Sequence, residues 1–312
     1  MKKWIAIITI LILAILTAAS FYFYKVAVYR SDKDFLDDNP DLDVSTDNSL
    51  LEQALSWMSK SNFETVSITS MDGLKLKGYY LEANEPTNQT VIIAHGYAGK
   101  AKNMAAYAKY YHETLNYHVL MPDARGHGAS EGDYIGFGWP ERKDYLQWID
   151  YIIDRKGEDS NIALHGVSMG ASTVLMTSGE ELTNQVKAII ADCGYTSAKD
   201  VLSYQLKRMY HLPSFPIIQT TSLLTKIRAG YSFGEASAIE QVKKTNLPIL
   251  YIHGEADTFV PVEMVHELYE ATPSEKDLYS VPKAEHGNAY DINPALYEEK
   301  VSSFLTNYMP NK

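Results

Sequence analysis

A serine flanked by glycines is the candidate catalytic nucleophile of this sequence. Residues 166–170 read Gly-Val-Ser-Met-Gly, a G-x-S-x-G pattern centred on Ser168. An apolar run precedes it at 161–164, and residues 171–176 can continue it as a helix. A strand, a tight turn and a helix would present the Ser168 hydroxyl outward, with glycines avoiding collisions with the neighbouring strand and helix. A chain of this length contains the pattern by chance about one time in ten, so other residues must support it.

Three more apolar runs end in residues that could assist such a serine. Backbone N–H groups are offered by residues 95–99 (HGYAG). A carboxylate is offered by residues 253–257 (HGEAD), and an imidazole by residues 285–288 (EHGN). A serine hydroxyl needs a base to take its proton, and a histidine base needs a carboxylate to orient it. A tetrahedral oxyanion needs two fixed donors, typically the N–H after the nucleophile and one from another loop. The candidates are therefore Ser168, Asp257 and His286, with the N–H groups of Tyr97 and Met169 as oxyanion donors.

Other side chains compete for the roles of acid and base. Glu255 and Asp192 are alternative carboxylates near the ends of apolar runs. Several other histidines stand beside glycines in tight loops, where an imidazole more often braces the backbone; they are His95, His127, His165 and His253. His286 is therefore the preferred base, whereas spacing alone leaves the acid open.

The elements that must position these residues alternate along the chain from about residue 63. Strand-like runs lie at 64–70, 74–81, 90–94, 117–121, 161–164, 186–191, 247–252 and 276–281, and helical patterns at 101–115, 141–155 and 294–308. This alternation predicts an α/β fold, with a mostly parallel sheet and helices on both faces. The turn at 71–73 makes one edge antiparallel. Residues 196–235 are helix-like without a strand, which predicts a helical cap.

Over residues 63–309 the chain resembles the α/β-hydrolase superfamily. The serine turn, the loop 95–99, and an acid and a histidine after successive late strands match in order, and residues 123–130 resemble the D-x-R-G-H-G-x-S loop of its lipase, esterase and aminopeptidase branches. The resemblance implies the Ser168–His286–Asp257 triad, because the last residue of the family's H-G-x-x-D pattern is the acid. Asp123, Arg125 and His127 are expected to order their loop rather than to react, with charges that pair with one another. The anchored, capped form resembles membrane-tethered bacterial hydrolases.

The N-terminus predicts a membrane anchor. Residues 4–24 carry no charge, and 21 residues at 1.5 Å each could span a hydrocarbon core of about 30 Å. Trp4 and the aromatic cluster 21–24 stand at the two ends, as interfacial aromatics do. Lys2 and Lys3 favour a cytoplasmic N-terminus, so the catalytic part would lie outside the cell. A cleaved signal peptide ending at the small residues 18–20, and hence a secreted protein, is the alternative.

The expected organisation is an anchor (1–30), an acidic spacer with a leading helix (31–62) and a hydrolase domain (63–312) with the cap at about 196–235. A net charge of −11 argues against nucleic acid as a partner. The single cysteine, Cys193, excludes an intrachain disulfide, and no ligand cluster suggests a metal. No cofactor is expected.

The predicted function is a membrane-anchored serine hydrolase that cleaves a carboxylic ester or lipid-like substrate. A peptidase of the same fold is one alternative, in which a cap carboxylate such as Glu235 or Glu240 would hold the substrate's amine. A non-catalytic, membrane-tethered binding protein is the alternative from another class.

Overall fold

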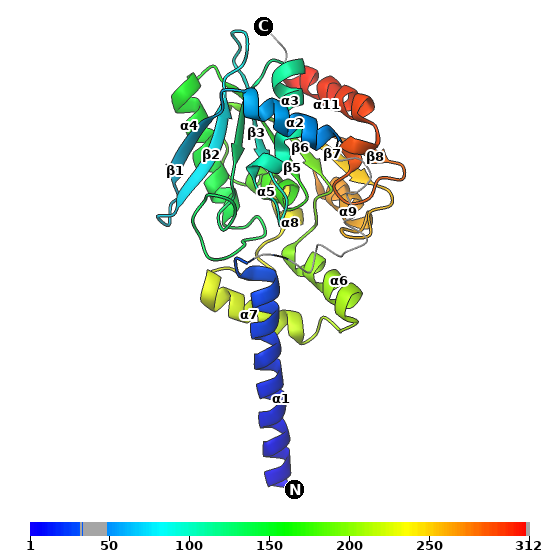
Figure 1. The fold of residues 1–312 in the computed structure, drawn as a ribbon. Coiled ribbons are helices and arrows are strands. Elements are labelled where there is room, and N and C mark those ends of the chain that lie inside the picture. The colour runs from blue at the N-terminus through cyan, green and yellow to red at the C-terminus, as the bar shows by residue number, and fades with distance from the viewer. Residues whose placement is uncertain (32, 34–48, 310–312) are drawn as a thin grey trace.

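An eight-stranded sheet forms the centre of the molecule. The computed structural model describes residues 1–31, 33 and 49–309 (Figure 1). The strand order is β1-β2-β4-β3-β5-β6-β7-β8, and only the β1/β2 and β2/β4 pairs are antiparallel. The strands are β1 (Glu64–Thr69), β2 (Lys75–Leu81), β3 (Gln89–Ala94), β4 (His118–Pro122), β5 (Asn161–Val167), β6 (Val186–Asp192), β7 (Ile249–Gly254) and β8 (Lys276–Val281). The predicted parallel sheet with one antiparallel edge is confirmed.

Helices cover both faces of this sheet, as predicted. One face carries α4 (Glu141–Lys156), α5 (Met169–Ser178), α8 (Ala238–Val242) and α9 (Glu263–Ala271). The other carries α2 (Ser49–Lys60), α3 (Ala105–Lys109), α10 (Ala289–Ile292) and α11 (Pro294–Tyr308). Within β3, Ile92 belongs to the first core, whereas Val91 and Ile93 belong to the second. A strand covered on both faces is apolar at every position, which explains the continuous run at 90–94.

The segment 101–115 differs from the single helix that its pattern predicts. It starts as a 3₁₀ turn, η4 (Ala101–Met104), continues as α3 and ends as a π-helical turn, η5 (Tyr110–Thr114). The widened last turn accompanies the burial of two adjacent tyrosines, Tyr110 and Tyr111. Helical periodicity cannot reveal such a change of turn, because the buried positions are decided by the neighbouring β5 and α11.

A helical cap is inserted between β6 and β7. It contains α6 (Ala198–Tyr210) and α7 (Ile217–Ala229), within the predicted range 196–235. Ser197 caps α6 by accepting the N–H of Asp200 at 3.0 Å. The two helices lie beyond the carboxyl ends of the parallel strands (Figure 1), at the edge where open α/β sheets bind ligands.

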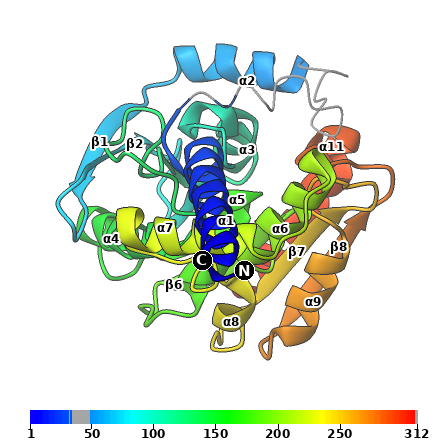
Figure 2. The ribbon, with the colours of Figure 1, turned by 90° about the horizontal axis from the view of Figure 1, so that it is seen from below.

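The N-terminal helix α1 (Lys2–Phe23) continues as a π-helical turn, η1 (Tyr24–Val28), and together they are long and apolar enough to cross a membrane. Figure 1 shows α1 extending away from the body, and Figure 2, which looks along it, places it between α6 and α7. The η1 turn packs on the body of the molecule, because Tyr24 and Val28 are buried and the N–H of Ile135 donates to the Val28 carbonyl at 2.7 Å.

The division of the chain at residues 30 and 62 stays a prediction, and most of the acidic spacer, residues 32 and 34–48, lies outside the described residues. The leading helix within 31–62 corresponds to α2. Across the first of these boundaries the chain is attached to the body, because the Arg30 guanidinium donates to the carbonyls of Ser130, Gly132 and Gly128.

Candidate active site

Ser168 lies at the apex of a strained turn between β5 and α5. Its backbone has φ +57° and ψ −118°, a conformation that an L-residue adopts at a cost of about 1–3 kcal/mol. The flanking glycines are required by space. A Cβ on Gly166 would lie 2.2 Å from the Gly170 carbonyl oxygen, and one on Gly170 would lie 2.1 Å from that of Ala94. The turn therefore has the geometry that the G-x-S-x-G pattern predicts.

Three side chains that are distant in sequence form one chain of hydrogen bonds. The Nε2 atom of His286 lies 2.8 Å from Ser168 Oγ, and its Nδ1 atom lies 2.7 Å from Asp257 Oδ2. In the neutral ring, Nδ1–H donates to the carboxylate, which leaves Nε2 to accept the serine proton. His286 and Asp257 are buried, whereas Ser168 is partly exposed.

Asp257 is held as an anion by its surroundings. Its Oδ1 atom accepts the N–H groups of Phe259 at 2.9 Å and Val260 at 2.8 Å. Burial alone would raise the pKa of the Asp257 carboxyl, but His286 and His253 outweigh it and hold that pKa well below its usual value. The His253 contact, with Nε2 3.2 Å from Asp257 Oδ2, was not expected. The four-residue spacing of the H-G-x-x-D pattern is the signal that could have indicated it.

The hydrogen bond of His286 Nδ1 goes to Asp257 and not to either competing acid. Glu255 is exposed. Asp192 is buried, its Oδ2 accepts the Tyr297 hydroxyl at 2.9 Å, and burial raises its pKa to about 6.

The other candidate histidines contact polar groups away from Ser168. His95 Nε2 accepts the Ala124 N–H at 3.0 Å, and His253 Nε2 lies 2.9 Å from the Val260 carbonyl oxygen. The ring nitrogens of His127 lie 2.9 Å from the Arg125 oxygen and 2.6 Å from that of Tyr97. His165 instead bonds two tyrosine hydroxyls, those of Tyr111 and Tyr297.

The two expected oxyanion donors lie beside Ser168. Met169 is the first residue of α5, so its N–H belongs to the N-terminal amides that have no acceptor within the helix. A Cβ built on Gly96 would lie 3.5 Å from the Ser168 Cβ, which places the Gly96–Tyr97 backbone against the serine. The Tyr97 hydroxyl donates to the Ala27 carbonyl at 2.6 Å, so this loop is also bonded to η1.

An apolar pocket reaches Ser168, and its walls come from separate parts of the chain. The cap contributes Leu202, Leu206 and Ile218 to its wall. Phe23, Val26 and Ala27, from the end of α1 and from η1, complete the wall. The sequence pattern does not predict this last contribution, because the aromatic cluster 21–24 is typical of a membrane interface.

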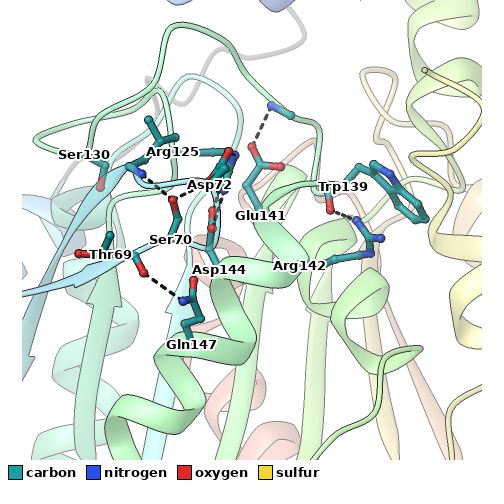
Figure 3. A network of polar contacts seen from close by, with 12 residues as sticks. Thr69, Ser70, Asp72, Arg125, Ser130, Trp139, Glu141, Arg142, Asp144 and Gln147 are labelled. Carbon is teal, nitrogen blue, oxygen red and sulfur yellow. Dashed lines mark hydrogen bonds and ion pairs between the residues drawn. The ribbon is translucent and has the colours of Figure 1, made fainter. Parts of the chain in front are cut away.

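The charges of the 123–130 loop do not pair with one another, contrary to expectation. Arg125 instead joins Asp72 on the β1–β2 turn, at 2.8 Å, to Asp144 on α4, at 2.7 Å (Figure 3). Asp123 accepts the N–H groups of Ala101 and Ala129, each at 2.8 Å. The loop is ordered as expected, by the Ala129 N–H within it and by Asp72, Asp144 and Ala101 outside it.

One group of potential metal-ligand atoms lies within 4.8 Å of one another, on Cys193, Asp257 and His286. The donor set does not fit a metal well, because His286 Nδ1 and the Asp257 carboxylate are bonded to each other. Burial also raises the pKa of the Cys193 thiol and so disfavours the thiolate that metals bind.

Comparison with known proteins agrees with this fold. Residues 85–212 match the family model described as serine aminopeptidase, S33. The uncharacterized protein YqkD of Bacillus subtilis is 32% identical over 240 residues, 77% of this chain and 78% of that protein. An uncharacterized membrane protein of Saccharomyces cerevisiae, YNL320W, is 22% identical over 72% of this chain and 74% of its own length. The Pyrococcus furiosus esterase Pf2001 has a similar structure, with a TM-score of 0.65, 25% identity, and coverage of 82% of this chain and 94% of the esterase.

The chain therefore belongs to the α/β-hydrolase superfamily. It is a hydrolase with a single N-terminal helix, among the described residues, that is apolar enough to span a membrane.

Proposed function

We propose that this protein is a serine hydrolase that cleaves carboxylic esters. Ser168 Oγ attacks the ester carbonyl while His286 Nε2 takes its proton, and the N–H groups of Tyr97 and Met169 bind the oxyanion. His286 then gives that proton to the leaving alkoxide, which departs as an alcohol and leaves an acyl-enzyme. Water, deprotonated by His286, hydrolyses the acyl-enzyme to a carboxylic acid. Asp257 orients His286 and stabilises its cationic form.

The observation that carries this proposal is the continuous hydrogen-bonded chain from Ser168 through His286 to Asp257, facing an apolar pocket. The strained Ser168 backbone is further support, since such strain is concentrated at functional sites. A binding protein without catalysis would need neither feature.

An apolar acyl group fits the pocket better than a peptide N-terminus does. An aminopeptidase needs a carboxylate to hold the substrate's amine, and the described pocket wall includes none. Glu235 is bonded to Lys226 at 2.9 Å, and Glu240 to Lys243 at 2.6 Å. The two carboxylates considered for that role are thus engaged on the surface.

We also propose that α1 anchors the protein in a membrane, with Lys2 and Lys3 in the cytoplasm and the catalytic body outside. The native chain should then sediment with membranes, resist extraction at alkaline pH and require detergent for release. A soluble mature chain that begins near residue 20 would contradict the anchor.

Hydrolysis of p-nitrophenyl esters from acetyl to palmitoyl tests the proposed reaction. The Ser168→Ala variant should lose at least about a thousandfold in kcat/KM, because the nucleophile is removed. Ser303→Ala, on the exposed side of α11, is the matched control and should retain full activity. Equal rates for Ser168→Ala and the native chain would disprove the assignment, and a folded native chain inactive on every ester would favour amide substrates.

A further inference from the structure

The length of α1 sets how deeply the protein must sit in a membrane. Every residue from Trp4 to Ile15 is exposed, whereas from Leu16 onward one side of the helix is partly covered by the rest of the chain. Those 12 free residues span only about 18 Å, but the hydrocarbon core is about 30 Å thick. The next eight residues, Leu16–Phe23 in sequence, supply the missing 12 Å or so. The part of α1 that packs beside α7 must therefore also lie in the membrane.

The surface of the cap next to this part of α1 is unusually apolar. Phe215, Leu223 and Ile227 are 72%, 63% and 74% exposed, and Leu212 is also exposed. Among the described residues outside 1–29, the other large apolar side chains with such exposure are scattered; they are Leu55, Met71 and Ile292. Figure 1 shows α7 and the α6–α7 connection at the edge of the body from which α1 emerges. This edge is the one that would face a bilayer.

Charge on the cap fits a lipid surface. Residues 196–235 carry five basic and two acidic side chains, an excess of three positive charges in a chain of net charge −11; these are Lys199, Lys207, Arg208, Lys226, Arg228, Asp200 and Glu235. The Arg228 guanidinium lies 5.7 Å from the ring centroids of Phe21 and Tyr24. Aromatic rings and a cation at one level, just before Lys25, are typical of the headgroup region.

The helices that meet the membrane also enclose the pocket. Phe23 at the end of α1, Leu206 on α6 and Ile218 on α7 all line the cavity that reaches Ser168. The exposed Leu223 and Ile227 are not among its lining residues, so α7 presents one side to the pocket and another outward.

We propose that the cap is a membrane-docking surface, with α7 and the α6–α7 connection immersed in the outer leaflet beside α1. The acyl chain of a membrane-resident ester enters the pocket from the bilayer between these helices, without crossing water. This inference rests on the proposed function for its substrate. The immersion itself rests on the proposed anchor, on the length of α1, on the apolar edge of the cap and on its positive charge.

The depth of the cap can be measured without any catalysis. The full chain is reconstituted in phosphatidylcholine–phosphatidylglycerol vesicles with a nitroxide at Ile227→Cys or, as the matched control, at Met71→Cys. Met71 is 79% exposed on the β1–β2 turn, and the native Cys193 is buried and stays unlabelled. The label at position 227 should be relaxed at least tenfold more by oxygen than by an aqueous nickel chelate, relative to the label at position 71. Equal accessibility of the two labels to the chelate would overturn the proposal.

A kinetic comparison tests the route of the substrate. Leu223→Glu/Ile227→Glu should lower hydrolysis of 4-methylumbelliferyl palmitate embedded in vesicles at least tenfold, while hydrolysis of water-soluble p-nitrophenyl acetate stays within twofold. Met71→Glu should change neither rate. Unchanged palmitate hydrolysis by the double variant would overturn the proposed route.

The two experiments also separate the two proposals. If the double variant loses both activities because it misfolds, the chains labelled at position 227 or position 71 still decide the depth of the cap. If the native chain cleaves neither ester, the proposed function fails, whereas the label at position 227 still reports whether the cap is immersed.

Discussion

At the scale of single residues, Ser168, His286 and Asp257 are connected by two short hydrogen bonds although they lie 118 and 29 positions apart along the chain. The anionic state of Asp257 is stabilised by two backbone N–H groups and two imidazoles. Its pKa is held well below its usual value, so Asp257 stays ionised wherever His286 can act as a base. A second carboxylate, Asp192, is close by but is bonded to Tyr297 instead.

Substitution of these two acids should separate their roles. Asp257→Asn should lower kcat by about 10⁴-fold, because an amide can stabilise the wrong tautomer of His286. Asp192→Asn is the matched control; its side-chain oxygen can still accept from Tyr297, so activity should stay within about tenfold of the native value. Steady-state kinetics on p-nitrophenyl butyrate measure both. The reverse order of the two losses would assign the acid to Asp192.

At the scale of elements, Arg125 joins the β1–β2 turn, the loop after β4 and the start of α4 (Figure 3). Asp144 and Arg125 are both nearly inaccessible to solvent, whereas Asp72 is half exposed. Burial raises the pKa of Asp144 while Arg125 opposes that rise. Removal of the guanidinium would thus leave a buried carboxylate without its counter-ion.

Arg125→Met should therefore lower the free energy of unfolding by about 3–5 kcal/mol. The folded variant would keep a proton on Asp144 that the unfolded chain releases, so its stability should fall as pH rises from about 5 to 8. Urea unfolding at both pH values measures this. Arg155→Met is the control, because Arg155 pairs with the half-exposed Glu64 and its loss should destabilise the fold much less than the loss of Arg125. A similar loss at both pH values would contradict the buried-charge argument.

The sequence predicts a feature of these elements when that feature depends on residues that are neighbours in the chain. The strands, the cap and α11 follow from apolar runs and helical periodicity, which are local properties. The partners of Arg125 do not, because Asp72 and Asp144 lie 53 and 19 positions from it on other elements. The π-helical end of the 101–115 segment likewise depends on packing against β5 and α11.

At the scale of the whole molecule, the N-terminal helical segment and the body are not independent units divided at residue 30. Residues on the two sides of that position contact one another. Val28 is fully buried, Tyr97 donates to the Ala27 carbonyl at 2.6 Å, and the Lys33 ammonium donates to the carbonyls of Val26 at 2.7 Å and Tyr29 at 2.9 Å. Burial lowers the pKa of that ammonium to about 8. The end of α1 and η1 thus belong both to the pocket that reaches Ser168 and to the proposed anchor.

Two truncations should distinguish the exposed part of α1 from the part that encloses the pocket. A chain that lacks residues 1–15 loses only the free part of α1 and should keep its Tm and its ester specificity. A chain that lacks residues 1–30 also loses the buried Tyr24 and Val28, so its Tm should fall by about 10 °C. It should also lose at least about tenfold in kcat/KM on palmitoyl esters relative to acetyl esters, because one pocket wall is missing. Equal behaviour of the two truncated chains would contradict the shared-wall interpretation.

The sequence by itself determined the class of fold, the serine turn and the candidate catalytic residues, because each rests on a local pattern: glycines where a Cβ cannot fit, and polar residues directly after apolar strands. It also indicated a helix able to span a membrane. Only the tertiary structure decided which carboxylate meets His286, which side chains hold Arg125, and that Phe23 and Val26 enclose the pocket. These contacts join distant parts of the chain, and close approach in space is set by the packing of whole elements rather than by residue type or spacing.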